Sequence, residues 1–199
     1  LSEEVENNWP KQLNNWCKDH NVISTGHFLA EEDISNHPLT LGNYMNMYQN
    51  MGIPGIDLTH GSALDAVTIG ANVAKQATSI GDFIGKQDFF CEIGQDEGQG
   101  ANVYDNIASV AVLQAMGINY LVSYYKLAKD EDDILLANTL ARINYLIDGN
   151  TAEKDVAIFY PIDGIMAEET PYNSNGNRIY TGSWGFNQYV SEISNCYRN

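Results

Sequence analysis

The sequence predicts an α/β protein built as the C-terminal half of a (β/α)8 TIM-type barrel. Short apolar runs of strand length alternate with segments in which apolar residues recur every three or four positions. This alternation is typical of βαβ units and a parallel sheet. A complete barrel takes about 250 residues, whereas this chain has 199 and fits half of the required repeats before about residue 150.

The expected elements follow from this alternation. The strands are short and apolar, and we place them at Val22–Thr25, Ile53–Leu58, Phe89–Cys91, Ile118–Ser123 and Val156–Tyr160. The helices carry apolar residues at helical spacing, and we place them at Val5–His20, Leu39–Met51, Ala71–Ile80, Asn106–Met116 and Asp133–Ile147.

The polar, turn-rich segment Gly149–Asp155 predicts a domain boundary. The apolar run after it ends at Pro161, as a new strand followed by a turn would. We therefore expect a half-barrel over residues 1–149 and the beginning of a second α/β domain over residues 150–199.

Composition and charge exclude several classes of partner. The chain has 26 acidic and 10 basic residues and a formal net charge of −16. Binding to nucleic acid or to an anionic membrane surface depends on Lys and Arg, so we expect neither partner. The apolar runs are also far shorter than the ~20 residues that span a bilayer.

The N-terminal segment is acidic and polar, unlike a signal peptide, and it begins without Met. We expect a processed chain or a piece of a longer one, and the compartment stays open between secreted, periplasmic and cytoplasmic. Cys17, Cys91 and Cys196 are widely spaced and odd in number, which favours neither a disulfide framework nor a zinc site. We expect all three thiols to be free, with Cys91 buried.

Polar side chains follow each of the first four predicted strands. In chain order they are His27, Glu31 and Glu32, then Asp57 and His60, then Glu92, and finally Ser123, Tyr124 and Tyr125. Because parallel strands place their carboxyl ends at one edge of a sheet, we expect these groups to form a polar cleft. Glu92, at the tip of a buried strand, is the first candidate for a catalytic group, although it could also cap a turn or pair with a lysine.

Several strings occur in the order seen in large bacterial glycoside hydrolases. They are STGHFLAEE at residues 24–32, GIPGID at 52–57, FFCEIG at 89–94, GINYLVSYY at 117–125 and ARINYLIDGNTAEKDVAIFYPIDGIMAE at 141–168. The chain resembles those enzymes related to the family 106 α-L-rhamnosidases and the family 2 barrels. The resemblance implies that its first strands are barrel strands five to eight. It also implies that a glutamine amidotransferase-like α/β domain begins near Val156.

The same resemblance implies a glycosidase that cleaves oligo- or polysaccharides with two carboxylates. It assigns Glu31 as the acid and Glu92 as the base or nucleophile. Residues that orient or stack on the sugar would be His27, Asp57, Tyr124 and Tyr125. The alternatives are a packed histidine at His27, a helix cap at Asp57 and plain packing for the two tyrosines. The resemblance also implies that the missing half of the barrel supplies the strand-four position, so this chain alone is expected to be inactive.

The prediction requires no cofactor, but leaves calcium open. Hard cations bind clustered carboxylate oxygens, and the acidic side chains available are Glu31, Glu32, Asp57, Asp96 and Glu97. Two other functions stay open: a non-catalytic carbohydrate-binding or assembly half-barrel, and a metal-assisted sugar-active lyase. Since unpaired edge strands need cover, we expect the N-terminal half of the barrel or a second copy as a partner.

Overall fold

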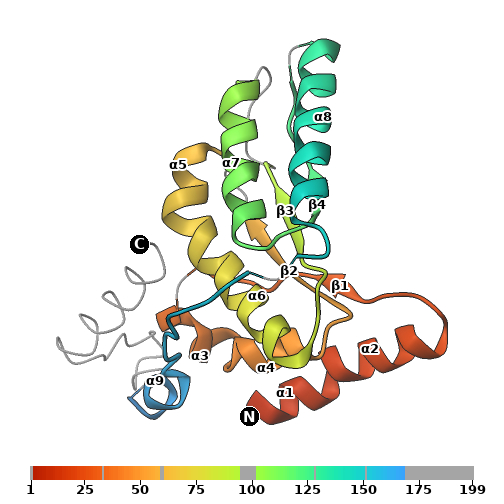
Figure 1. Cartoon of the computed structure of the whole chain (residues 1–199). Coiled ribbons are helices and arrows are strands. Elements are labelled where there is room, and N and C mark those ends of the chain that lie inside the picture. The colour runs from red at the N-terminus through yellow and green to blue at the C-terminus, as the bar shows by residue number, and fades with distance from the viewer. Residues whose placement is uncertain are drawn as a thin grey trace.

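The computed structural model describes residues 2–32, 34–58, 61–94, 102–127, 129–150 and 152–168. Its centre is a four-stranded parallel sheet in the order β1-β2-β3-β4, which curls as half of a barrel (Figure 1). The strands are β1 Thr25–Gly26, β2 Ile53–Leu58, β3 Phe90–Ile93 and β4 Tyr120–Ser123. The expected α/β half-barrel sheet is therefore confirmed.

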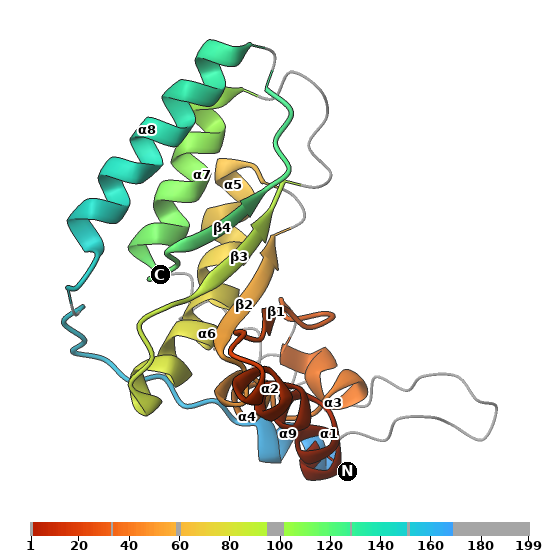
Figure 2. The ribbon, with the colours of Figure 1, turned by 90° about the vertical axis from the view of Figure 1, so that its right-hand side faces the viewer.

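The helices that follow β2, β3 and β4 lie on one side of the sheet (Figure 2). Before the sheet come α1 Ser2–Asn8 and α2 Pro10–Asp19, and between β1 and β2 lie the 3-10 turn η1 Ile34–Asn36, α3 His37–Thr40 and α4 Tyr44–Gln49. Beyond β2 come α5 Ala63–Asp65, the π-helical turn η2 Ala66–Gly70, α6 Ala71–Ile84, α7 Val103–Ala115, α8 Asp130–Ile147 and α9 Ile162–Glu168.

The strand register assigns side chains to two faces of the sheet. Ile56 of β2 pairs with Cys91 of β3, and Asp57 pairs with Glu92. Because successive side chains of a strand point to opposite faces, Ile56 and Cys91 share one face, and Asp57 and Glu92 share the other. Ile56 and Cys91 are fully buried under the helices, whereas the Asp57 and Glu92 side chains are 21% and 24% exposed. We call the face that carries Asp57 and Glu92 the open face.

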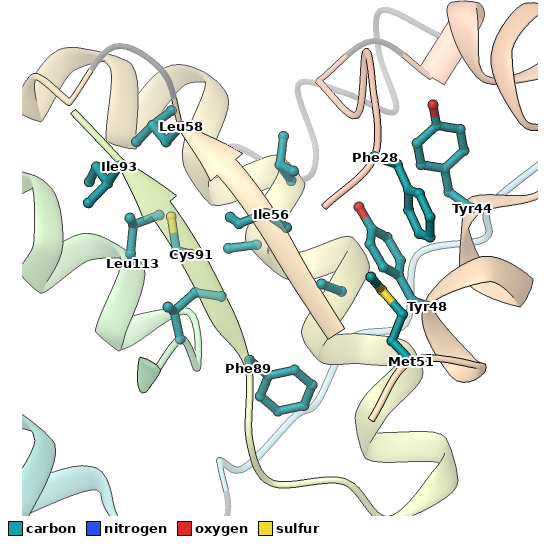
Figure 3. Close-up of a cluster of buried hydrophobic side chains, with 14 of the residues drawn as sticks. Phe28, Tyr44, Tyr48, Met51, Ile56, Leu58, Phe89, Cys91, Ile93 and Leu113 are labelled. Carbon is teal, nitrogen blue, oxygen red and sulfur yellow. The ribbon is translucent and has the colours of Figure 1, made fainter. Parts of the chain in front are cut away.

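The core has two neighbouring parts (Figure 3). One lies between the sheet and the helices and contains Ile56, Leu58, Cys91, Ile93 and Leu113. The other lies where the segment after β1 meets α4 and contains Phe28, Tyr44, Tyr48 and Met51. This aromatic part packs beneath the end of β1 and so supports the loop that follows it.

Two predicted helices are each divided in the structure. The helix expected over Val5–His20 is two helices, because Pro10 has no N–H to donate and its ring clashes with the preceding turn. The helix expected over Leu39–Met51 is interrupted at Gly42, whose φ of +83° belongs to the left-handed region. Asn43 then caps the new helix α4 with its side chain.

The predicted strand Val156–Tyr160 is wrong. This segment pairs with no strand among the described residues. It instead runs from α8 across to α9 beside α3 (Figure 2). Ile158 and Tyr160 pack against the buried side chains of Ile34 and Ile165. The apolar run therefore supplies two partly buried side chains to this contact, while Val156 and Phe159 are 80% and 76% exposed.

Cys17 and Cys91 are free and Cys91 is buried, as the sequence predicts, and Cys17 is buried as well. Cys196 lies outside the described residues. Among the helices of the described part of the chain, none combines the length and apolar character that crossing a bilayer requires.

Replacing Gly55 with Ala is expected to destabilise the half-barrel by about 2–3 kcal/mol, as overpacking does. A Cβ on Gly55 would collide with the carbonyl oxygen of Gly26 in β1 and with the ring of Phe90 in β3. Both contacts belong to paired strands, so the sheet itself would have to shift. The free energy of unfolding from urea titration measures this loss.

Gly164→Ala is the matched control. Gly164 lies within α9, and an added Cβ there would have no neighbour within 4 Å among the described residues beyond its own helix. Alanine should therefore leave stability unchanged or raise it by up to about 1 kcal/mol through helix propensity. Equal stability of the two variants would contradict the close packing at Gly55.

Candidate functional site at the carboxyl ends of the strands

Side chains from the ends of the strands meet on the open face. His27 Nε2 lies 3.6 Å from Glu92 Oε2 and 3.9 Å from Asp57 Oδ2. The hydroxyl of Tyr124, just beyond β4, hydrogen-bonds to Glu92. The structure therefore brings together four of the site residues expected from the sequence, each at or just beyond the end of a different strand.

Local geometry explains this convergence. Asp57 and Glu92 are register partners on adjacent parallel strands, so their side chains leave the sheet side by side. His27 directly follows β1, and Tyr124 directly follows β4. The His27 side chain is 33% exposed, so the cluster is open to solvent and to a bound molecule.

Glu92 is the centre of the cluster. The hydrogen bond to Glu92, and then the negative charge of Glu92, raise the pKa of the Tyr124 phenol above its ordinary value. Tyr124 therefore remains protonated at neutral pH, and its hydroxyl donates a hydrogen bond to the carboxylate. Protonated His27 would be a cationic neighbour of the same carboxylate. Both contacts orient the Glu92 carboxylate on the open face.

Glu31, expected from the sequence as the acid, is only 2% exposed. Its Oε1 accepts hydrogen bonds from Phe28 N at 2.7 Å and Tyr48 Oη at 3.0 Å, and its Oε2 accepts one from Asp57 N at 3.0 Å. Burial raises the pKa of Glu31 to about 8, against these three hydrogen bonds, and the charge of Asp57 adds to the rise. The acid role stays a prediction, and the geometry favours a different role, because both carboxyl oxygens face protein donors.

A small cavity lies between the loop after β1 and the end of β2. Its volume is about 170 Å³, and its lining includes His27, Glu31, Glu32 and Asp57. Apolar side chains complete the lining, and a cavity of this size with several polar groups can hold water molecules. It adjoins the cluster on the open face through the shared residues His27 and Asp57.

Tyr125 supports the loops around the site. Its hydroxyl donates a hydrogen bond of 2.6 Å to the carbonyl of Gly61. Its ring lies where a Cβ on Gly61 or Gly94 would stand, so both glycines leave room for it. The ring is partly buried against the core. Stacking of Tyr125 on a sugar stays a prediction.

The described residues contain no group of three or more His, Cys, Asp or Glu side chains that could hold a metal ion. Of the carboxylates suggested for calcium, Asp96 and Glu97 lie outside the described residues, as does His60. Glu31 directs its oxygens at N–H and O–H donors. Calcium binding stays a prediction.

Two residues that the sequence patterns do not mark as site residues, His37 and Tyr160, support the site. His37 is fully buried and stacks on Tyr44 with ring centroids 3.8 Å apart. Its Nε2 lies 3.0 Å from the carbonyl oxygen of Glu31, and its Nδ1 lies 2.7 Å from the hydroxyl of Tyr160. No linear motif could reveal this contact, because His37 and Tyr160 are 123 positions apart.

The cluster thus offers two carboxylates, an imidazole and a phenol at the carboxyl ends of parallel strands. Comparison of the chain with family models, curated proteins and solved structures finds no match.

Proposed function

We propose that the chain is the C-terminal half of a glycoside hydrolase barrel and cleaves glycosidic bonds of oligo- or polysaccharides with two carboxylates. The observation that carries this proposal is the position of Glu92 at the carboxyl end of a parallel strand, facing the open side and contacted by His27 and Tyr124. Parallel α/β proteins keep their chemistry at these strand ends.

Glu92 acts at the anomeric carbon, as nucleophile or as the base that activates water. The Tyr124 hydroxyl and His27 hold its carboxylate in place. Asp57 stands beside Glu92 on the same wall of the half-barrel, where it can accept hydrogen bonds from sugar hydroxyls. Since the two reacting carboxyls flank the scissile bond, the proton for the leaving oxygen comes from the opposite wall of the barrel.

That opposite wall belongs to a complementary half-barrel, either the N-terminal half of the same barrel or a second copy. The side chains of Tyr120 and Val122 lie on the open face, because these residues pair in register with Phe90 and Glu92. They are 50% and 43% exposed. Apolar side chains that face the interior of a complete barrel would be exposed in this way when the other half of the barrel is absent. In this proposal, residues 150–199 begin a second, glutamine amidotransferase-like α/β unit.

A second candidate function is non-catalytic carbohydrate binding. The exposed rings of Tyr120 and Tyr124 favour it, because aromatic side chains offer large rigid surfaces with a polar tip to a ligand. In this case the chain would bind oligosaccharides without changing them.

The proposal can be tested with the assembled barrel, which is this chain together with its complementary half. The assay measures the release of nitrophenol from a panel of 4-nitrophenyl glycosides. Hydrolysis of at least one glycoside supports it. Oligosaccharide binding without hydrolysis would support the second candidate. An unsaturated, ultraviolet-absorbing product that forms only with added Ca²⁺ would instead indicate a lyase. No turnover and no binding would contradict both carbohydrate functions.

A further inference from the structure

The Glu31 carboxyl group lies where the pairing of β1 with β2 stops. Ile53 N donates to Ser24 O at 2.9 Å, so the N–H of Ile53 points toward β1. Asp57 lies an even number of residues further along β2, and alternate residues of a strand direct their N–H groups to the same neighbour. β1, however, ends at Gly26, which pairs with Pro54. The N–H of Asp57 therefore points toward β1 beyond the end of that strand.

Glu31 accepts a hydrogen bond from this N–H. Its Oε2 lies 3.0 Å from Asp57 N, and its Oε1 lies 2.7 Å from Phe28 N in the segment that continues β1. The carboxyl group thus joins two backbone N–H groups across the gap, in place of a further rung of the sheet. One N–H belongs to Asp57 itself, and the other to the residue directly after His27.

We infer that Glu31 is a positioning residue: its carboxyl group clamps the end of β2 to the segment after β1 and so fixes His27 relative to Asp57. The clamp leaves both carboxyl oxygens engaged with protein donors, beneath the open face. Glu31 therefore shapes the site without transferring a proton to a substrate. The inference concerns the site of the proposed function, but its structural part holds whether or not the protein cleaves glycosides.

The backbone of Glu31 is itself held from the opposite side. Its carbonyl oxygen accepts a hydrogen bond from His37 Nε2 at 3.0 Å and one from Gln76 Nε2 at 3.4 Å. The preceding residue, Ala30, has a φ of +60°, a conformation that costs a non-glycine residue of the order of 1 kcal/mol. A strained turn persists only when its surroundings hold it, and here His37, Gln76 and the carboxyl clamp do so.

The groups that face the Glu31 carboxyl shift its pKa in opposite directions. The hydrogen bond from Tyr48 stabilises its ionised form and the charge of Asp57 destabilises that form. Burial, with the negative charge of Glu31, raises the pKa of Tyr44 to about 12 and also raises the pKa values of Tyr48 and Cys91. His37 donates its hydrogen bond to the backbone carbonyl of Glu31. A titration that Phe28 and Asp57 share near pH 8 would therefore report Glu31.

Amide-proton NMR of the 199-residue chain tests the clamp without any substrate. As Glu31 ionises, the Phe28 and Asp57 amide protons should move downfield together, with one common midpoint near pH 8. Glu31→Gln should abolish both titrations and shift the His27 ring resonances. Tyr48→Phe should keep both titrations and move the common midpoint upward, because it removes a hydrogen bond that favours the ionised form.

Separate midpoints for the two amides would overturn the inference. A shared titration that survives Glu31→Gln would also overturn it. An unchanged midpoint in Tyr48→Phe would overturn it too, which keeps the inference testable if Glu31→Gln does not fold. In the assembled barrel, a fall in kcat for Glu31→Gln with unmoved His27 resonances would indicate proton transfer by Glu31 and refute positioning. Absence of hydrolysis by the wild type would count against the proposed function alone.

Discussion

Glu92→Gln is expected to lower kcat of the assembled barrel by about a thousandfold or more, the scale of losing a reacting carboxylate. Glutamine keeps the shape of the side chain, but its neutral amide can neither attack the anomeric carbon nor take a proton from water. The contact with Tyr124 survives through the amide oxygen, so substrate binding should change much less than turnover. Steady-state kinetics on the best 4-nitrophenyl glycoside would measure the change in kcat and KM.

Asp88→Asn is the matched control for this variant. Asp88 is exposed and precedes β3 at the end opposite to Glu92, so the same neutralisation there should leave kcat unchanged. Far-ultraviolet circular dichroism and the melting temperature would verify that both variants are folded. Hydrolysis by folded Glu92→Gln at the wild-type rate would eliminate Glu92 as the reacting carboxylate.

Stability is expected to fall as pH rises from about 4.5 to about 8, because Glu31 binds its proton more tightly in the folded chain. Its pKa is raised from 4.5 to about 8 by burial. Between these values the folded state keeps the proton while the unfolded state has lost it. Unfolding therefore releases one proton, and each pH unit removes up to about 1.4 kcal/mol of stability. Above about pH 8 this contribution levels off.

Urea titrations at pH 5, 6, 7 and 8 would measure this slope, with Glu31→Gln as the comparison. The acidic chain also repels itself more strongly as pH rises, and that repulsion is common to both proteins. The difference between wild type and variant therefore isolates Glu31. Parallel stability curves for the two proteins would mean that Glu31 titrates equally in the folded and unfolded states.

The sheet and the cluster on the open face could be predicted because each depends on local pattern. The β2 strand Ile53–Leu58 was predicted with the same bounds that the structure has. The expectation that Asp57 and Glu92 would meet needed only the rule that parallel strands end at one edge. His27 and Tyr124 followed from the same rule.

Features that depend on distant contacts could not be predicted in this way. The sequence marks Glu31 as a carboxylate near a strand end, but its burial depends on Tyr48 and on the early end of β1. The run Val156–Tyr160 has the apolar, β-branched and aromatic composition of a strand, but it pairs with no strand among the described residues. The break at Pro10, in contrast, has a local signal, because a proline marks the start of a helix. The prediction of one helix over Val5–His20 gave more weight to the apolar spacing.

The contact between His37 and Tyr160 has a consequence for the order in which the chain folds. These residues are 123 positions apart, and chains fold from the N-terminus as they leave the ribosome. The strands and α8 leave the ribosome before Tyr160 does. The turn that carries Glu31 acquires its last support only after that point. The nascent half-barrel should therefore gain its sheet first and its finished site last, when the C-terminal segment reaches His37.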